Sequence, residues 1–221
     1  MSSNSKMVQS RLDNGRQVQA SVDTHFETCV QAFIQELSPY LPQGQTLDAM
    51  QVKLVCQAIQ KRYQHHLEGM QQSDEAVQLE RGETLAVRAQ LDRAVEQTYD
   101  MIINFKQSIR QKYGAEYLKQ LRLQGGTPRH FEALLQQCSQ LQTWCEQPQN
   151  EFPTQVSSPF EEPFQKTHVL RVVQDAKTAL HKAVDQYRKE QREDEAVFQQ
   201  KNLALQKHDQ VEKQTVQFFR L

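Results

Sequence analysis

Residues 165–221 read QKTHVLRVVQDAKTALHKAVDQYRKEQREDEAVFQQKNLALQKHDQVEKQTVQFFRL, a stretch of 57 residues without a glycine or a proline. Apolar side chains recur in it at helical spacing, which predicts one very long helix. At about 1.5 Å of rise per residue, that helix would be roughly 85 Å long. Its flanks cannot all be hidden inside a compact globule, so the stretch indicates an elongated helical protein.

A charged run interrupts this helix at residues 188–195, where seven of eight side chains are charged. We expect the run to project into solvent, in a helix that is either continuous or kinked there. A second, weaker apolar set follows it, and an uncovered apolar stripe favours a two-fold partner. The alternative is that the last two members of the set fold back onto the first two helices of their own chain, or bind a different protein. The set comprises Val197, Ala204, Val211, Phe218 and Phe219.

Glycines and prolines divide the rest of the chain into shorter segments that also repeat at helical spacing. The pattern predicts an all-α, elongated antiparallel bundle of five or six helices in one domain, residues 1–221, with residues 1–16 disordered or frayed and 147–163 a proline-rich linker before the helix of residues 164–221. The first expected helix runs from about residue 17, or from an earlier start, to residue 37. The others are a second capped by Thr46 and fading near Gly69, a third from Ser73 to about Tyr113, a short one around 116–123, and one opened by Thr127 as N-cap and Pro128.

Composition excludes several classes of protein. Twenty-six basic and 27 acidic residues leave a formal charge of −1, so no global field draws the chain to nucleic acid or anionic membrane. No stretch approaches the roughly 20 apolar residues that span a bilayer, and the first residues lack the apolar core of a secretory leader. The four cysteines lie among apolar residues in helical segments, which is typical of reduced thiols. We therefore expect a cytoplasmic protein.

Two segments resemble known sequences: GGTPRHFEALLQQ at residues 125–137 and KEQREDEAVFQQKNLALQKHDQVEKQTVQFFRL at residues 189–221. They resemble bacterial all-helical proteins described only as hypothetical proteins, which pair a Gly-x-Thr-Pro helix start with a charged C-terminal helix. The resemblance covers about a quarter of the chain. It implies a bacterial origin and a helical fold, and it implies no activity or cofactor.

Catalytic and metal-binding motifs are missing from the sequence. No histidine has a glutamate three residues before it, and no His-Glu-x-x-His or Cys-x-x-Cys occurs. His25 and Cys29 lie four residues apart and could supply two ligands, but no second pair at ligand spacing accompanies them. No phosphate-binding glycine loop is present either. We therefore expect no enzyme, no cofactor and no metal.

The most site-like segment is the loop from Gly125 to Arg129, because a helix N-terminus presents free N–H groups to anions. Basic residues gather within residues 106–130, and they could contact phosphate groups or stack on bases. The alternative is a glycine-terminated helix followed by an ordinary capped start. The candidate anion-binding set is Gly125, Gly126, Thr127, Arg129 and Arg122.

These patterns favour a non-enzymatic structural or protein-interaction module of the bacterial cytoplasm, binding another protein or a second copy of itself. An anion- or nucleic-acid-binding protein that uses residues 106–130 is a less favoured alternative. A membrane-active effector is another, although no segment pairs a Lys/Arg-rich face with a Trp/Phe-rich one.

Overall fold

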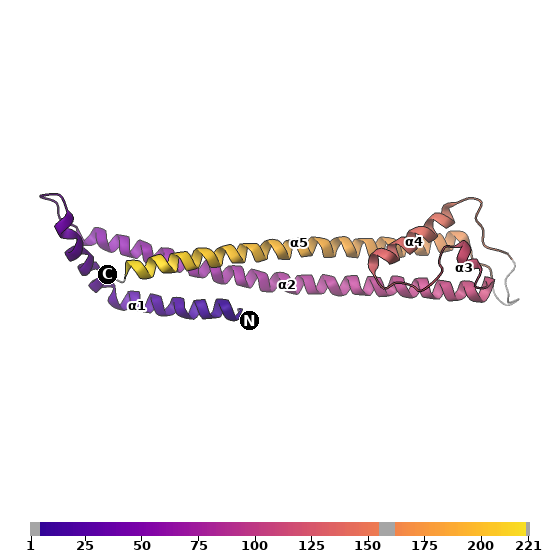
Figure 1. Ribbon diagram of the computed structural model, residues 1–221, viewed down its shortest axis with the longest axis horizontal. Coiled ribbons are helices and arrows are strands. Elements are labelled where there is room, and N and C mark those ends of the chain that lie inside the picture. Colours follow the sequence, from indigo (N-terminus) through magenta and orange to yellow (C-terminus); the bar gives the residue numbers. More distant parts are fainter. Residues whose placement is uncertain (1–4, 155–161, 220–221) are drawn as a thin grey trace. The chain divides into compact units, whose positions relative to one another are not determined.

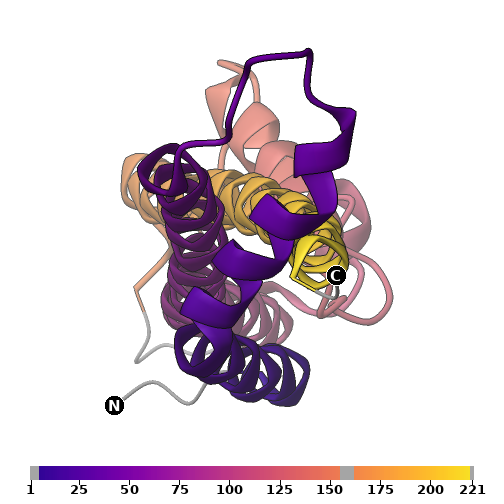
Figure 2. The ribbon, with the colours of Figure 1, turned by 90° about the vertical axis from the view of Figure 1, so that its left-hand side faces the viewer.

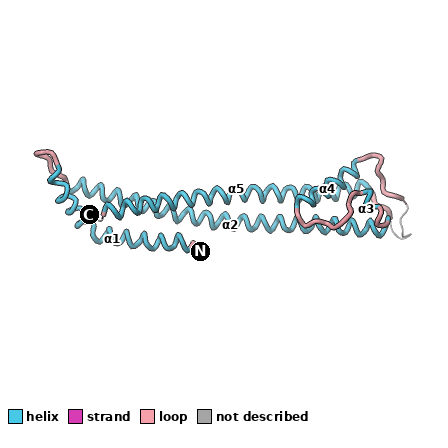
Figure 3. Tube along the Cα trace, viewed as in Figure 1, coloured by secondary structure: helices cyan, strands magenta, loops and turns pink. Residues whose placement is uncertain are grey.

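The computed structural model describes residues 5–154 and 162–219. Helices and connecting loops make up this described part of the chain, and it contains no strand (Figure 3). The predicted all-α class and very long C-terminal helix are confirmed. In chain order the elements are α1 (Lys6–Leu37), the 3-10 turn η1 (Ser38–Tyr40), α2 (Ala49–Tyr113), α3 (Tyr117–Gln120), α4 (Phe131–Glu146) and α5 (Lys166–Phe218).

Helix α2 is one helix of 65 residues, so the predicted break between Gly69 and Ser73 is wrong. A glycine inside a helix costs only about 1 kcal/mol relative to alanine. The Ser73 hydroxyl donates to the Met70 carbonyl 2.8 Å away, within the helix, and does not cap a new one. Burial every seven residues along this part of α2 explains the continuity; the buried positions are Cys56, Tyr63, Met70 and Val77.

Two helix starts also differ from the prediction. The N–H of Met50 donates to Asp48 Oδ1 at 3.0 Å, so Asp48, not Thr46, caps α2. Helix α1 begins at Lys6, and the described part of the segment expected to be disordered or frayed is therefore helical. Val8 and Leu12 account for this, because both are buried and their burial stabilises the first turns.

The chain divides into two compact units. The single domain predicted from the sequence stays a prediction. Unit 1 comprises Met1–Gly82 with Glu193–Leu221, and unit 2 comprises Glu83–Arg192. On α5 the boundary falls inside the charged run of residues 188–195, through which the chain remains helical. A run without apolar side chains cannot contribute to a hydrophobic core, which explains why the boundary between the units falls there.

Unit 1 is a three-helix assembly of α1, the first part of α2 and the last part of α5 (Figure 2). Val8 and Leu12 of α1 pack with Leu67 and Met70 of α2 and with Leu205 of α5. A second cluster joins Val30 and Phe33 of α1 to Cys56 of α2. The seam of α5 also buries a polar residue every seven positions: Lys201, His208 and Thr215.

Unit 2 pairs the last part of α2 with the first part of α5, and α3 and α4 pack on this pair (Figure 1). The seam predicted on α2 is confirmed, since Leu91, Ile102 and Ile109 lie in one core. Burial of such side chains is the main favourable term in forming the unit. The rest of that core is formed by Tyr117, Leu118, Leu121, Leu123, Leu134, Cys138, Leu141, Cys145, Phe152, Val169, Val173, Leu180, Ala183 and Val184.

Candidate functional site

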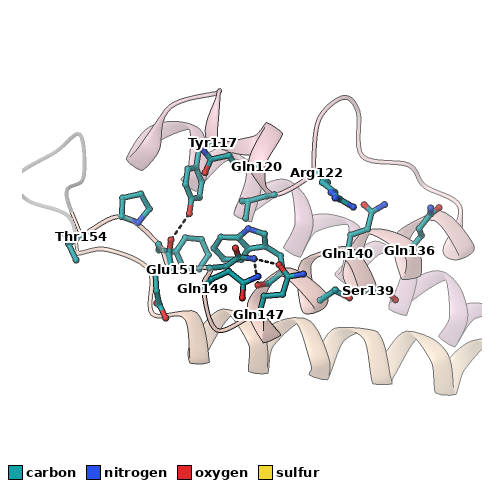
Figure 4. Close-up of a pocket in the computed structure, with 16 residues that line it drawn as sticks. Tyr117, Gln120, Arg122, Gln136, Ser139, Gln140, Gln147, Gln149, Glu151 and Thr154 are labelled. Carbon is teal, nitrogen blue, oxygen red and sulfur yellow. Dashed lines mark hydrogen bonds between the residues drawn. The ribbon is translucent and has the colours of Figure 1, made fainter.

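Unit 2 contains a groove with a volume of about 1090 Å³ between α3, the loop that follows it, the outer face of α4 and the segment of residues 147–154 (Figure 4). Its volume is slightly above that of ordinary ligand sites, which enclose roughly 300–1,000 Å³. The residues that line it are Tyr117, Gln120, Leu121, Arg122, Gln136, Ser139, Gln140, Thr143, Trp144, Gln147, Gln149, Asn150, Glu151, Phe152, Pro153 and Thr154.

Aromatic packing fixes the wall formed by residues 147–154. Phe152 is buried, and its ring centroid lies 4.9 Å from that of Trp144 and 6.2 Å from that of Tyr117. The Tyr117 hydroxyl donates to the Glu151 carbonyl at 3.1 Å, and the Asn150 amide donates to the Trp144 carbonyl at 3.0 Å (Figure 4). This segment lies in the predicted linker and is not helical, but it is packed against the core. Residues 155–161 of that linker lie outside the described residues.

The groove is lined mainly by uncharged polar groups. Gln120 and Gln136 are exposed and Gln140 is half-buried, and within the described residues no hydrogen bond engages their amides. Each free amide offers two donors and an acceptor. Arg122 is the only cation among the lining residues that the structure describes, and in Figure 4 its guanidinium lies on the same side of the groove as the Gln140 amide. The lining suits a polar ligand that both donates and accepts hydrogen bonds.

Arg122 owes its position to the end of α3. The N–H of Leu123 donates to the Leu118 carbonyl at 3.0 Å, and the N–H of Arg122 donates to the Lys119 carbonyl at 3.1 Å. This pair of bonds is a Schellman motif, which places one residue in the left-handed region. That residue is Arg122, with φ of 55°, and Leu118 and Leu123 are both buried. The predicted stop at Gly125-Gly126 is therefore wrong, because the helix ends before Gly125.

The residues of the candidate anion-binding set have different surroundings, and anion binding by them stays a prediction. Helix α4 begins at Phe131 with His130 as N-cap, so the prediction that Thr127 caps it is wrong. The Arg129 guanidinium stacks 4.7 Å from the centroid of the Tyr99 ring. Of the predicted set only Arg122 lines the groove, whereas Gly125, Gly126, Thr127 and Arg129 do not.

Lys106, within the basic region predicted around this loop, is buried in unit 2. Its ammonium donates to the Gly125 carbonyl at 3.5 Å, which is the outer limit for a hydrogen bond. Burial lowers the pKa of this lysine, and the nearby Arg110 lowers it further. A cation held in this way is not presented to a phosphate group.

The C-terminal apolar set packs largely within its own chain. Val211 is buried, and the Phe218 ring lies 4.4 Å from that of Phe33 on α1. Phe219 joins the same cluster. Val197 and Ala204 are half-buried. This is the fold-back that the sequence left as an alternative to a two-fold interface, and self-association stays a prediction.

The thiols are poorly suited to nucleophilic catalysis, which requires the thiolate. All four cysteines are free. Burial raises the pKa of Cys138 and of Cys145 to about 11, and it also raises the pKa of Cys56. Cys29, which the sequence paired with His25, lies 3.9 Å from the carbonyl of Phe219, which accepts a weak hydrogen bond from its Sγ.

Sequence reasoning did not find the groove. One pattern in the sequence pointed to it: Gln136, Gln140 and Thr143 recur at spacings of four and three, which is the polar face of α4. The opposite wall comes from a segment rich in proline, whose packing depends on Phe152. No local pattern predicts that contact.

No helix in the described part of the chain is apolar enough over sufficient length to cross a bilayer. No protein-family model matches the chain, and no curated protein or solved structure matches it either. The resemblance to bacterial all-helical proteins stays a prediction.

Proposed function

We propose that this chain is a non-enzymatic protein-interaction module that binds an extended segment of a partner protein in the groove of unit 2. The observation that carries the proposal is the lining of that groove by amides without hydrogen-bond partners, including those of Gln120, Gln136 and Gln140. An extended backbone exposes N–H and C=O groups in alternation. Amide side chains can satisfy both kinds of group, and they do so without demanding a charge on the ligand.

Two aromatic residues support a polypeptide over a small polar molecule. Trp144 is half-buried and lines the groove beside the amides, so the exposed part of its ring offers apolar surface to a side chain of the segment. The buried Phe152 ring packs 4.9 Å from it and holds it in place. Aromatic side chains are enriched where proteins bind one another. Arg122 and Glu151, one charge of each sign, favour neither a polyanion nor a polycation.

The same arrangement supports a binding rather than a catalytic role. A nucleophile needs a base within hydrogen-bond reach. The only hydroxyl side chains that α4 contributes to the groove are those of Ser139 and Thr143, and Ser139 donates to the Leu135 carbonyl of its own helix at 2.8 Å. No histidine is among the lining residues described.

The test is selection of peptides from a random library on the purified chain, followed by titration calorimetry with the peptides obtained. Thr143→Trp places an indole in the groove from an exposed position of α4. We expect it to weaken peptide binding by about 5- to 150-fold, since the displaced contacts are worth about 1–3 kcal/mol.

Thr178→Trp is the matched control, because Thr178 is exposed on α5 and does not line the groove. It should bind the selected peptides as the wild type does. A library that yields no saturable binder refutes the proposal. Equal binding to the Thr143→Trp protein refutes the groove as the site.

A further inference from the structure

We propose that unit 1 binds one divalent transition-metal ion at His208, Asp209 and Glu212 of α5. The first observation is His208 itself. Its side chain is fully buried, and neither ring nitrogen has a hydrogen-bond partner among the residues that the structure describes. Buried polar atoms in proteins are almost always paired, so an imidazole buried without a partner calls for an explanation. The neutral imidazole is also the commonest metal ligand among side chains.

The second observation is the geometry around the imidazole. His208 Nδ1 lies 3.5 Å from Asp209 Oδ1 and 4.0 Å from Glu212 Oε2, and the three ligand atoms all lie within 4.8 Å of one another. Metal–nitrogen and metal–oxygen bonds of about 2.0–2.2 Å separate neighbouring ligand atoms by roughly 3–3.5 Å. His208 Nδ1 and Asp209 Oδ1 already lie at such a separation, and the Glu212 carboxylate must move closer to close the set around one ion.

Access favours an ion that arrives from solvent. The side chains of Asp209 and Glu212 are 39% and 27% exposed, whereas that of His208 is 0% exposed. The imidazole is therefore the inner ligand and the carboxylates are the outer ones. Water would complete the coordination on the exposed side. One nitrogen with two carboxylate oxygens suits Zn²⁺ or a neighbouring first-row ion better than Ca²⁺ or Mg²⁺, which prefer oxygen alone.

Arg11 of α1 is the strongest argument against the site, because it already binds Asp209. Its Nε donates to Oδ1 at 2.8 Å and one terminal nitrogen donates to Oδ2 at 2.9 Å. An ionised carboxylate has about four acceptor positions, so Oδ1 can serve both Arg11 and an ion. Two carboxylates and one guanidinium contribute a net charge of −1 around the imidazole. Arg11 then orients Asp209 as an outer-shell partner, and its charge weakens the affinity.

Tyr63, a further neighbour of the imidazole, does not compete for an ion. The Tyr63 ring of α2 lies 5.7 Å from that of His208, and burial raises the pKa of Tyr63 to about 12, so its hydroxyl is neutral. Its hydroxyl oxygen is also buried without a hydrogen-bond partner. Tyr63 and His208 are thus two neighbouring side chains that are buried without hydrogen-bond partners in the described structure, and the packing of the three helices does not explain them.

The test is calorimetric titration of the full chain, stripped with EDTA, with Zn²⁺. We expect one ion per chain, and Co²⁺ should bind with visible absorption bands typical of nitrogen and oxygen ligands. Glu212→Gln removes one ligand charge at a partly exposed position and should weaken Zn²⁺ binding at least about tenfold. His208→Phe should abolish the Co²⁺ bands, and if that variant fails to fold, Glu212→Gln decides.

His65→Gln is the control for adventitious binding, because His65 is exposed on α2 beside a second histidine, His66. The control should bind Zn²⁺ as the wild type does. Absence of saturable one-to-one binding overturns the proposal, and so does Zn²⁺ binding by Glu212→Gln that equals that of the wild type. If only His65→Gln loses binding, the ion belongs to the exposed pair and the proposal is wrong.

Discussion

Lys201→Met should destabilise unit 1 strongly, because Lys201 neutralises a buried carboxylate. Its ammonium forms an ion pair with Asp74, whose side chain is fully buried, while its own is 7% exposed. Ser5 also donates to Asp74, from its N–H at 2.8 Å and from its hydroxyl at 3.0 Å. After the substitution, the two bonds from Ser5 are the remaining support for the buried charge within the described part of the chain.

Breaking a buried ion pair by removing one partner costs about 3–5 kcal/mol. Against a total stability of about 5–15 kcal/mol for an ordinary domain, that loss is large. Replacing both partners is different: Asp74→Leu with Lys201→Met exchanges the pair for apolar side chains, which is often neutral or stabilising. Ser5 then loses its acceptor, at a cost of about 1–3 kcal/mol. We therefore expect the double variant to be more stable than Lys201→Met alone.

The pH dependence of stability should have opposite signs in the wild type and in Lys201→Met. Burial raises the pKa of Asp74, but hydrogen bonds from Lys201 and Ser5 outweigh it and hold the pKa below its ordinary value. A depressed pKa contributes stability that is present above the ordinary value and lost as pH falls through the folded-state value. Without Lys201, burial prevails and the pKa of Asp74 rises. The deficit of the variant should then be greatest at neutral pH and shrink on acidification.

Urea unfolding followed by far-ultraviolet circular dichroism, at a series of pH values between about 4 and 7, measures these differences. A loss below about 1 kcal/mol at neutral pH would show that the pair is not desolvated as the structure has it. A deficit independent of pH would show that Asp74 is not the group left unpaired. A double variant less stable than Lys201→Met would refute the assignment of the loss to an uncompensated charge.

Three further predictions concern stability and use the same unfolding assay. A Cβ on Gly15 would lie 2.6 Å from Leu67 Cδ1 and 3.1 Å from the Tyr63 hydroxyl, so Gly15→Ala should lower the free energy of unfolding by about 1 kcal/mol net of its helix propensity. Gly69 has no such neighbour within 4 Å, so Gly69→Ala should raise the free energy of unfolding by up to about 1 kcal/mol. A gain at both sites contradicts the close approach at Gly15. Arg122→Gly should stabilise unit 2 by about 0.5–1 kcal/mol, because φ of 55° costs an arginine more than a glycine; a loss would mean that its side-chain contacts outweigh that strain. Lys106→Met should raise the free energy of unfolding at neutral pH, because the pKa of the buried lysine is lowered and its charge opposes folding. The advantage of the variant over the wild type should shrink as pH rises through that lowered pKa. A loss of stability at neutral pH would refute the argument.

The sequence predicts the helices better than their ends. Periodicity finds α5 and the seam of Leu91, Ile102 and Ile109, because burial every three or four residues is a repeated pattern. It fails at Gly69 and Ser73, where a glycine and a serine look like a helix end. The chain continues as helix there because Met70 and Val77 extend the buried seam and because Asp74 is buried against Lys201, a partner more than a hundred residues away in the sequence.

The candidate sites illustrate the same limit. The sequence identifies Arg122 as a member of an anion set, but its φ and its position at the groove follow from the Schellman motif that ends α3. Likewise, His208 and Glu212 are visible as a spacing of four on one helix. No local sequence pattern predicts that the imidazole is buried, since its burial depends on the packing of α1 and α2 over it.

The polar residues in the seam of α5 give unit 1 a definite register. A seam of apolar side chains alone would present nearly equivalent surfaces after a shift of one heptad. The seam of α5 differs, because three different polar residues are buried in it at intervals of seven: Lys201, His208 and Thr215. A shift of that size would carry Lys201 away from Asp74 and leave both charges buried without partners. The cost of that arrangement is several kcal/mol, which is enough to exclude the shifted packing. The ion pair thus selects one alignment of α2 with α5, and Ser5 extends the selection to α1 through its two bonds to the same carboxylate. The register brings Arg11 to Asp209, and the proposed metal site therefore depends on the buried pair two turns away.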